Sequence, residues 1–180
     1  DGVRVNRFVE GEAPGVFYGF VIDGVYANQA AIDGDANLAN DPDRKAIVQP
    51  GDFIRRDLNG DGKITGEDQE ILGDPTPDFI YGLNIAGTYK DLDFGLFFQG
   101  SQGNEIYNVT RYYNIFWADD NKLSEIKNAW TPTNTNTDIP RMTTSDAAQN
   151  GAPSSFFVED GSYFRLRTLE IGYTIPTDKI

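Results

Sequence analysis

The residues best suited to chemistry lie between Asp57 and Asp68, where oxygen-bearing side chains recur at alternate positions. A hard cation takes six to eight oxygen ligands, and alternate residues of a tightly turning loop point the same way. Gly62 stands at the sharp-turn position of an EF-hand-type loop. The pattern predicts a structural Ca²⁺ site whose ligands, with a backbone carbonyl at the lysine, are Asp57, Asn59, Asp61, Lys63, Thr65 and Asp68.

Two features of this loop depart from the calcium pattern. Asp68 stands at the last ligand position, where the longer Glu is usual, and no strong helix precedes Asp57. The same residues also suit a series of Asx and glycine turns that needs no ion. The loop therefore has two interpretations, a calcium site or an ion-free turn.

A second candidate site is aromatic. Exposed aromatic faces stack on sugar rings and on flat peptide groups, so aromatic residues in a polar segment are candidate ligand contacts. The alternative is that they pack their own loop against its neighbours. The candidates are Tyr112, Tyr113, Phe116 and Trp117.

Composition limits the class of protein. The net charge of −13 over 180 residues argues against binding to nucleic acid or to an anionic membrane surface. The chain has no Cys and no His, which removes disulfides, the usual zinc ligands and Ser-His-Asp chemistry. No catalytic residues are predicted, and the chain is not expected to be an enzyme.

The clearest structural signal is a period-two alternation of apolar and small or polar residues over 79–89. A tight reversal at Lys90-Asp91 leads to a second alternating strand over 92–100. Each strand has the ~9–11 residues of a tilted membrane-spanning strand, with an apolar band on one face that ends in tyrosines. A hairpin of a soluble β-sandwich shows the same alternation, so the pattern alone leaves both possibilities.

The remaining elements are long connections and further strands. Short helices are expected near 29–32, 67–72 and 122–130. Strands are predicted at about 16–26, 79–89, 92–100 and 156–175, and long loops at about 27–78 and 101–155. One short reversal opposite two long connections is typical of outer-membrane barrels, whose long loops are extracellular. The predicted fold is all-β, with antiparallel strands of a partial outer-membrane β-barrel, long extracellular loops and short helices. Four strands are fewer than the ~8 of the smallest bacterial barrels, so the chain cannot close a barrel alone.

An ordered series of short runs resembles the C-terminal part of SusC/RagA-type TonB-linked outer-membrane transporters. The resemblance covers most of the chain from about Gly15 onward. The runs are Gly51-Asp-Phe, Asp57-Leu-Asn-Gly-Asp-Gly-Lys-Ile64, Ile71-Leu-Gly-Asp-Pro-Thr-Pro-Asp-Phe79, Tyr81-Gly-Leu-Asn84, Phe97-Phe-Gln-Gly100, Gly103-Asn-Glu-Ile-Tyr-Asn108, Trp130-Thr-Pro132, Ile139-Pro-Arg141, Val158-Glu-Asp-Gly-Ser-Tyr-Phe-Arg-Leu166 and Leu169-Glu-Ile-Gly-Tyr-Thr-Ile-Pro176.

This resemblance implies a Bacteroidetes-type barrel in the Gram-negative outer membrane, in contact with lipid, that imports glycan oligosaccharides or peptides. It implies two protein partners, a SusD-like surface lipoprotein and the TonB-ExbB-ExbD energy complex. The plug domain, the TonB-contacting segment and the final strands are missing from the sequence, which is expected to be an internal segment of such a transporter. The mechanism implied is binding and translocation, with Ca²⁺ ordering a loop.

Two other classes remain as alternatives. One is a soluble extracellular calcium-stabilised β-domain, either dockerin-like or a carbohydrate-binding module, although a dockerin would carry two calcium repeats where this chain has one. The other is a glycoside hydrolase with paired carboxylates, but nothing in the sequence selects a pair among its 28 Asp and Glu residues.

Overall fold

The chain folds as two compact units in the computed structural model, which describes residues 4–116 and 121–176. The loop unit comprises Asp1–Gly73 and Tyr107–Glu159. The sheet unit comprises Asp74–Ile106 and Asp160–Ile180. Among the described residues, no helix is long and apolar enough to cross a membrane.

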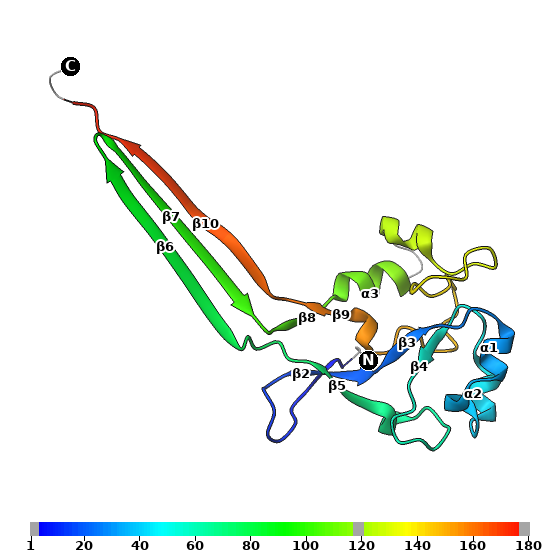
Figure 1. Ribbon diagram of the computed structural model, residues 1–180. Helices are drawn as coiled ribbons and strands as arrows, with labels where there is room; N and C mark the ends of the chain where they lie inside the picture. Colours follow the sequence, from blue (N-terminus) through cyan, green and yellow to red (C-terminus); the bar gives the residue numbers. More distant parts are fainter. Residues whose placement is uncertain (1–3, 117–120, 177–180) are drawn as a thin grey trace. The chain divides into compact units, whose positions relative to one another are not determined.

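The sheet unit is built on three long antiparallel strands, β6 (Phe79–Tyr89), β7 (Leu92–Gln102) and β10 (Tyr163–Tyr173). They lie side by side in the order β10-β7-β6 (Figure 1). β6 spans the residues whose alternation predicted a strand, and β7 runs two residues beyond the expected end. Lys90 in the connecting turn has φ 54°, as tight two-residue hairpin turns require.

The register gives the sheet two chemically distinct faces, because directly paired residues of antiparallel strands point to the same side. The apolar face carries Phe79, Tyr81, Leu83, Ile85, Tyr89, Leu92, Phe94, Leu96, Phe98, Phe164, Leu166, Leu169, Ile171 and Tyr173. The polar face carries Gly82, Asn84, Ala86, Thr88, Asp93, Gly95, Phe97, Gln99, Ser101, Arg165, Thr168, Glu170 and Gly172, with Ile80 and Tyr163 at one end.

A β-bulge interrupts β10 at Arg167. Leu166 pairs with Phe98 and Thr168 pairs with Phe97, so Arg167 is an extra residue without a partner of its own on β7. A one-residue slip normally turns every later side chain to the opposite face. Here the apolar residues of β10 change from even to odd sequence positions across the bulge, and the bulge keeps them all on the apolar face.

The loop unit contains two small sheets of short strands. β1 (Asn6–Arg7), β2 (Val16–Phe20) and β5 (Gln69–Gly73) form one sheet in the order β1-β2-β5, and β3 (Ile22–Val25) pairs with β4 (Phe53–Arg55). β8 (Glu105–Tyr107) pairs with β9 (Val158–Asp160).

The single strand expected over 16–26 is instead the two strands β2 and β3, which separate at Val21 and join different sheets. The segment is apolar on both faces, so its sequence has no change of period to mark the break. Likewise, the strand expected over 156–175 is divided into a 3₁₀ turn, β9 and β10.

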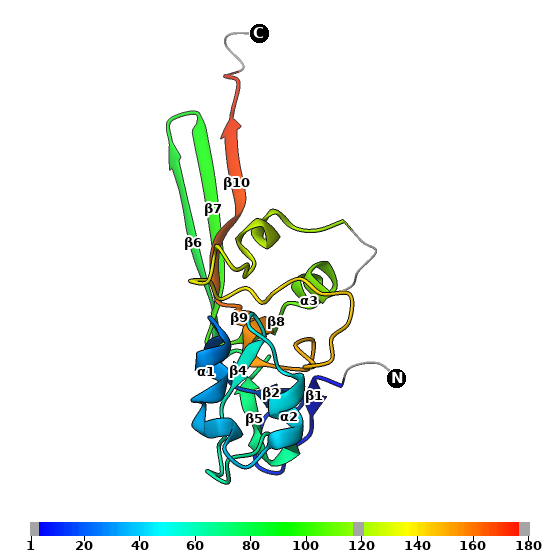
Figure 2. The ribbon, with the colours of Figure 1, turned by 90° about the vertical axis from the view of Figure 1, so that its right-hand side faces the viewer.

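Seven short helices occur in the described part of the loop unit. They are α1 (Gln29–Asp33), η1 (Ala36–Leu38), α2 (Pro42–Ile47), η2 (Gly66–Asp68), α3 (Val109–Phe116), η3 (Ser124–Asn128) and η4 (Ser155–Phe157), where η marks a 3₁₀ helix. Figures 1 and 2 show α1 and α2 beside the β3-β4 ladder.

Two of the expected helices differ from the structure. The segment 67–72 is a single 3₁₀ turn followed by β5, because pairing with β2 extends the backbone from Gln69 onward. The segment 122–130 contains only η3, which has no side-chain cap on its first turn. The loop expected over 101–155 contains α3, which the sequence reading missed.

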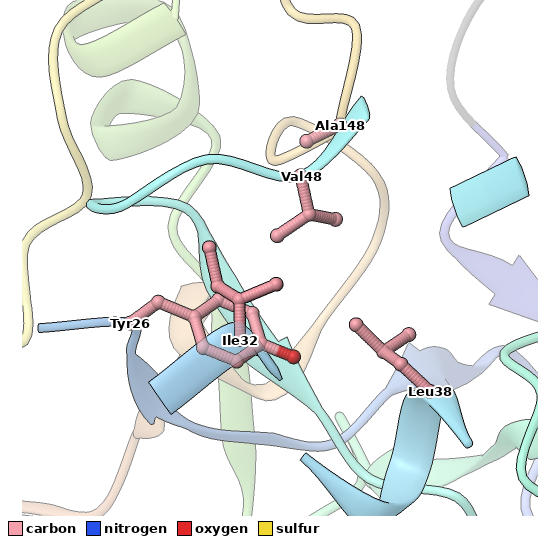
Figure 3. Packing of buried hydrophobic residues seen from close by; sticks show 5 residues of the cluster. All are labelled: Tyr26, Ile32, Leu38, Val48 and Ala148. Carbon is pink, nitrogen blue, oxygen red and sulfur yellow. The ribbon is translucent and has the colours of Figure 1, made fainter. Parts of the chain in front are cut away.

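The core of the loop unit gathers residues from its two chain segments. Tyr26, Ile32, Leu38, Val48 and Ala148 form a buried cluster (Figure 3). Ile54 and Ile64 pack against this cluster. Ile64 belongs to the candidate calcium loop, so that loop is anchored on the core.

Candidate functional site

The candidate calcium loop begins two residues after β4 and ends in η2. Asp57 accepts two backbone hydrogen bonds, one from Gly60 N–H to Oδ1 and one from Gly62 N–H to Oδ2, each 2.7 Å long. Desolvation opposes ionisation of this carboxyl, but the N–H groups of Gly62, Gly60 and Asp61 outweigh it and lower the pKa of Asp57. Asp57 is therefore a carboxylate at neutral pH.

The middle of the loop is a series of Asx turns. Asn59 Oδ1 accepts from Asp61 N–H at 2.9 Å, and Asp61 Oδ1 accepts from Lys63 N–H at 2.8 Å. Gly60 and Gly62 have φ of 75° and 77°, a region that glycine enters without strain. Each polar side chain thus fixes the backbone two residues further along.

The buried Asp68 holds the two ends of the loop together. Its carboxylate is fully buried, and it accepts from Leu58 N–H at 3.0 Å through Oδ1 and from Thr65 N–H at 2.7 Å through Oδ2. Thr65 Oγ1 in turn accepts from Glu67 N–H at 3.2 Å, which completes a capping box on η2. Asp68 therefore joins the first and last turns of the loop.

The outer turn of the loop is held by the chain between η1 and α2. Asn40 donates from its side-chain amide to the Asp61 carbonyl at 2.7 Å and from its backbone N–H to the Gly62 carbonyl at 2.8 Å. A Cβ on Gly62 would lie 2.9 Å from Asn40 Nδ2, so this contact also requires glycine.

This geometry supports the Asx-turn interpretation directly, because the carboxylates of Asp57, Asp61 and Asp68 all accept backbone N–H groups. Within residues 4–116 and 121–176, no group of three or more His, Cys, Asp or Glu side chains is arranged to hold a metal ion. The calcium site stays a prediction.

The four aromatic candidates have different surroundings. Tyr112 and Phe116 lie on α3 and pack against the fully buried Phe157, with ring centroids 5.7 Å and 5.8 Å apart. Burial raises the pKa of the Tyr112 phenol, so this residue is neutral. Tyr113 is 46% exposed and meets Tyr112 edge-on, whereas Trp117 lies outside the described residues. Of the three described residues, Tyr113 has the most accessible ring.

The helix α3 carries Tyr112, Tyr113 and Phe116 and begins at a cap that its sequence could have revealed. Asn108 accepts from Arg111 N–H at 2.8 Å through Oδ1, and it donates from Nδ2 to Glu159 at 2.9 Å. Asn is a preferred N-cap residue. The cap signal lies within Asn108-Val-Thr110, where a glycosylation motif also matches.

A buried polar cluster in the loop unit escaped the sequence analysis. Asp52 is fully buried; its Oδ1 accepts from Arg141 Nε at 2.6 Å and from Asn150 Nδ2 at 2.9 Å. Asn150 Oδ1 then accepts from Phe53 N–H at 2.9 Å. These bonds join segments nearly one hundred residues apart, and no local spacing connects such partners.

The apolar face of the sheet unit is an unusual surface. Its exposed fractions include 50% at Leu83 and 72% at Ile171. Aromatic rings gather near one end, where Phe164 stacks on Tyr81 and on Phe98, and Tyr89 and Tyr173 pair near the other end through Leu92. A soluble monomer seldom exposes so many contiguous apolar side chains, so this face is built to be covered.

Comparisons with known proteins identify what the chain resembles. No protein-family model matches it. TonB-dependent receptor P3 of Formosa agariphila is 44% identical over 167 residues, which are 93% of this chain and 16% of that receptor. TonB-dependent receptor P26 of the same organism is 39% identical over 178 residues, which are 97% of the chain and 17% of the receptor. The chain thus spans about a sixth of the length of these relatives.

A solved structure shows the same fold. The structure of the RagAB peptide transporter matches 97% of this chain and 18% of its own, with a TM-score of 0.66 and 18% sequence identity. The relatives by sequence are receptors and not enzymes, in agreement with the expectation from composition. The predicted resemblance is confirmed: this chain belongs to the TonB-dependent receptors, of which it is a segment.

Proposed function

We propose that the chain forms part of the wall and outer loops of a TonB-dependent outer-membrane transporter. The observation that carries the proposal is the apolar face of β6, β7 and β10. Eleven residues at about 3.3 Å each make strands of roughly 36 Å, and a tilt of about 45° reduces this to the ~25 Å of an outer-membrane apolar band. Lipid would cover this face.

The polar face would then line the interior of a barrel completed by other parts of the full-length protein. The short turn at Lys90-Asp91 would face the periplasm, and the loop unit would lie outside the cell. The substrates would be glycan oligosaccharides or peptides, and a SusD-like lipoprotein and the TonB complex would be the partners. The structural neighbour RagAB is named a peptide transporter, which supports peptides as one of the two proposed classes of substrate.

We also propose that Ca²⁺ orders the loop 57–68 without taking part in chemistry. The fit is partial. Asp57 is held as a carboxylate, and the loop is anchored on the core through Ile64. Asp68, however, is fully buried and already accepts a backbone N–H on each carboxylate oxygen, which leaves it fewer lone pairs for an ion, so we expect modest affinity.

The wall proposal is tested by placing one arginine on each face of β6 in the full-length protein. Leu83→Arg puts a charge on the apolar face, near the middle of the strand, and should destabilise the barrel by about 2–4 kcal/mol. Asn84→Arg is the matched control, because the adjacent residue lies on the polar face opposite Phe97. The measurement is the heat-modifiable, folded fraction recovered in outer-membrane preparations.

We expect Leu83→Arg to lower that fraction strongly and Asn84→Arg to leave it near the wild-type level. Equal behaviour of the two variants would contradict the lipid-facing assignment. Monodisperse folding of the wild-type protein without detergent would instead support the soluble calcium-stabilised domain.

A further inference from the structure

The polar face of the sheet unit carries a pair of cations, Arg165 and Arg167, in a chain whose net charge is −13. Both residues are exposed. Arg165 pairs with Gln99 across the β10-β7 ladder. Arg167 Nη1 donates to Gln99 Oε1 at 2.9 Å, which places its guanidinium on the same face. Gln99 therefore contacts the Arg167 guanidinium and stands opposite Arg165, whose own guanidinium lies over the neighbouring Tyr163 ring.

The bulge explains how the second arginine is accommodated. Arg167 is the extra residue of β10, and the ladder is regular on both sides of it. Removing it would let Thr168 follow Leu166 directly, opposite Phe97 and Phe98, with every face assignment unchanged. The extra residue is therefore not needed for the apolar face, and what it adds is one positive side chain on the polar face.

Neither arginine is neutralised within the described residues. The ion pairs there involve Arg56, Arg111 and Arg141, and Arg165 lies over the Tyr163 ring at 5.0 Å. An arginine has five N–H donors, so the single bond to Gln99 leaves most of the Arg167 fork available.

The two acidic side chains on the same face, Asp93 and Glu170, lie away from the two arginines. Glu170 lies over Gly95, with Oε2 3.7 Å from the position of a Cβ there, and Asp93 lies against Gly172. On the neighbouring strand β6, Gly82 pairs with Gln99 and has no side chain to cover the cluster. The space above Gln99 is therefore bordered by the donors of the two arginines and, on the β6 side, by Gly82 with the Phe97 ring over it.

We propose that Arg165, Gln99 and Arg167 bind an anionic group, a carboxylate or a sulfate ester, on an oligomeric substrate. Planar guanidinium groups match the oxygen spacing of such anions through paired hydrogen bonds, and the neutral Gln99 amide adds a further donor. This inference rests on the proposed function, since it requires that the polar face lines a passage. It makes the substrate acidic rather than neutral.

The test uses the full-length protein in detergent and isothermal titration with three probes. A galacturonate hexamer supplies carboxylates, a sulfated galactan hexamer supplies sulfate esters, and maltohexaose is the neutral control. Deletion of Arg167 removes one cation while keeping the strand register, and Arg165→Gln removes the other. Lys90→Gln is the matched control, because it removes one positive charge from the hairpin turn, away from the cluster.

We expect one or both acidic hexamers to bind the wild type, with affinity reduced at least tenfold by either arginine change and unaltered by Lys90→Gln. If deletion of Arg167 prevents assembly, Arg167→Gln takes its place. Equal binding by wild type and arginine variants would overturn the inference, as would tight binding of maltohexaose alone. Failure of both acidic probes with a properly assembled wild type also overturns it, whether the cause is an acidic segment of the protein covering the arginines or a neutral substrate. Such a result leaves the proposed function intact, because that function is tested separately by the assembly of the Leu83→Arg and Asn84→Arg variants.

Discussion

Asp57 and Asp68 stand at the first and last positions of one sequence pattern but hold different parts of the loop. Asp57 organises the outer turns through Gly60 and Gly62, whereas Asp68 is buried and joins Leu58 to Thr65. The pattern predicted both as calcium ligands of the same kind. Burial separates them, since Asp68 is fully buried and Asp57 is only partly so, and no spacing within the loop could predict this difference.

Calcium dependence follows from these residues. Thermal melting of the full-length protein should show a rise in midpoint when Ca²⁺ is added and a fall with excess chelator. Asp57→Ala combined with Asp61→Ala should abolish this difference, because two of the predicted ligands are removed. Asp43→Ala, in α2 and outside the loop pattern, is the control and should keep it. A native midpoint that ignores chelator would leave the loop as an ion-free turn.

Among the elements, the hairpin of β6 and β7 was the most predictable, because its two faces differ at most positions and its turn is two residues long. β10 was less predictable, since the bulge at Arg167 interrupts the alternation of apolar and polar residues within the strand. α3 and β5 were missed because a cap and a distant partner, rather than local alternation, define them. The sequence pattern named the residues of the candidate loop, whose role as calcium ligands stays a prediction, but it could not predict the hydrogen bonds that each residue makes.

Two glycines of β7, Gly95 and Gly100, provide a test of packing within the sheet. A Cβ on Gly100 would contact the Tyr81 ring and lie 2.6 Å from the Tyr163 carbonyl, whereas a Cβ on Gly95 would meet only Glu170 at 3.7 Å or more. We expect Gly100→Ala to destabilise the full-length protein by about 1–3 kcal/mol. Gly95→Ala, on the same strand, should change stability by less than about 0.5 kcal/mol.

Chemical denaturation of the folded protein in detergent, followed by tryptophan fluorescence, measures both variants. Equal midpoints for the two would show that the ring of Tyr81 does not restrict Gly100.

At the scale of the whole molecule, the loop unit depends on bonds between its two chain segments. Asp52 and Arg141 are 89 residues apart, and Arg141 N–H also donates to the Gly51 carbonyl at 2.8 Å. Trp130 packs on Gly51 from the same side, where a Cβ would lie 2.6 Å from the ring. The segments 49–53 and 130–141 therefore form one packed junction.

Breaking this junction should loosen the loop unit without removing the sheet. Arg141→Ala leaves Asp52 buried without its cation, a change that costs about 3–5 kcal/mol when a buried pair loses one partner. Arg56→Ala is the control, since its ion pair with Asp23 is exposed and contributes little. Limited proteolysis in intact outer-membrane vesicles should cut the loop unit of Arg141→Ala faster than that of Arg56→Ala. Equal cleavage rates would contradict this.

The division of the loop unit into Asp1–Gly73 and Tyr107–Glu159 also constrains the order of folding. The β6-β7 hairpin is local and lies between the two segments, so it can pair as soon as it has been synthesised and exported. The loop unit must wait for Arg141 and Asn150, and β10 follows later still. The pairing of β10 with β7 therefore spans the whole second segment of the loop unit, whereas β6 and β7 are joined by a two-residue turn.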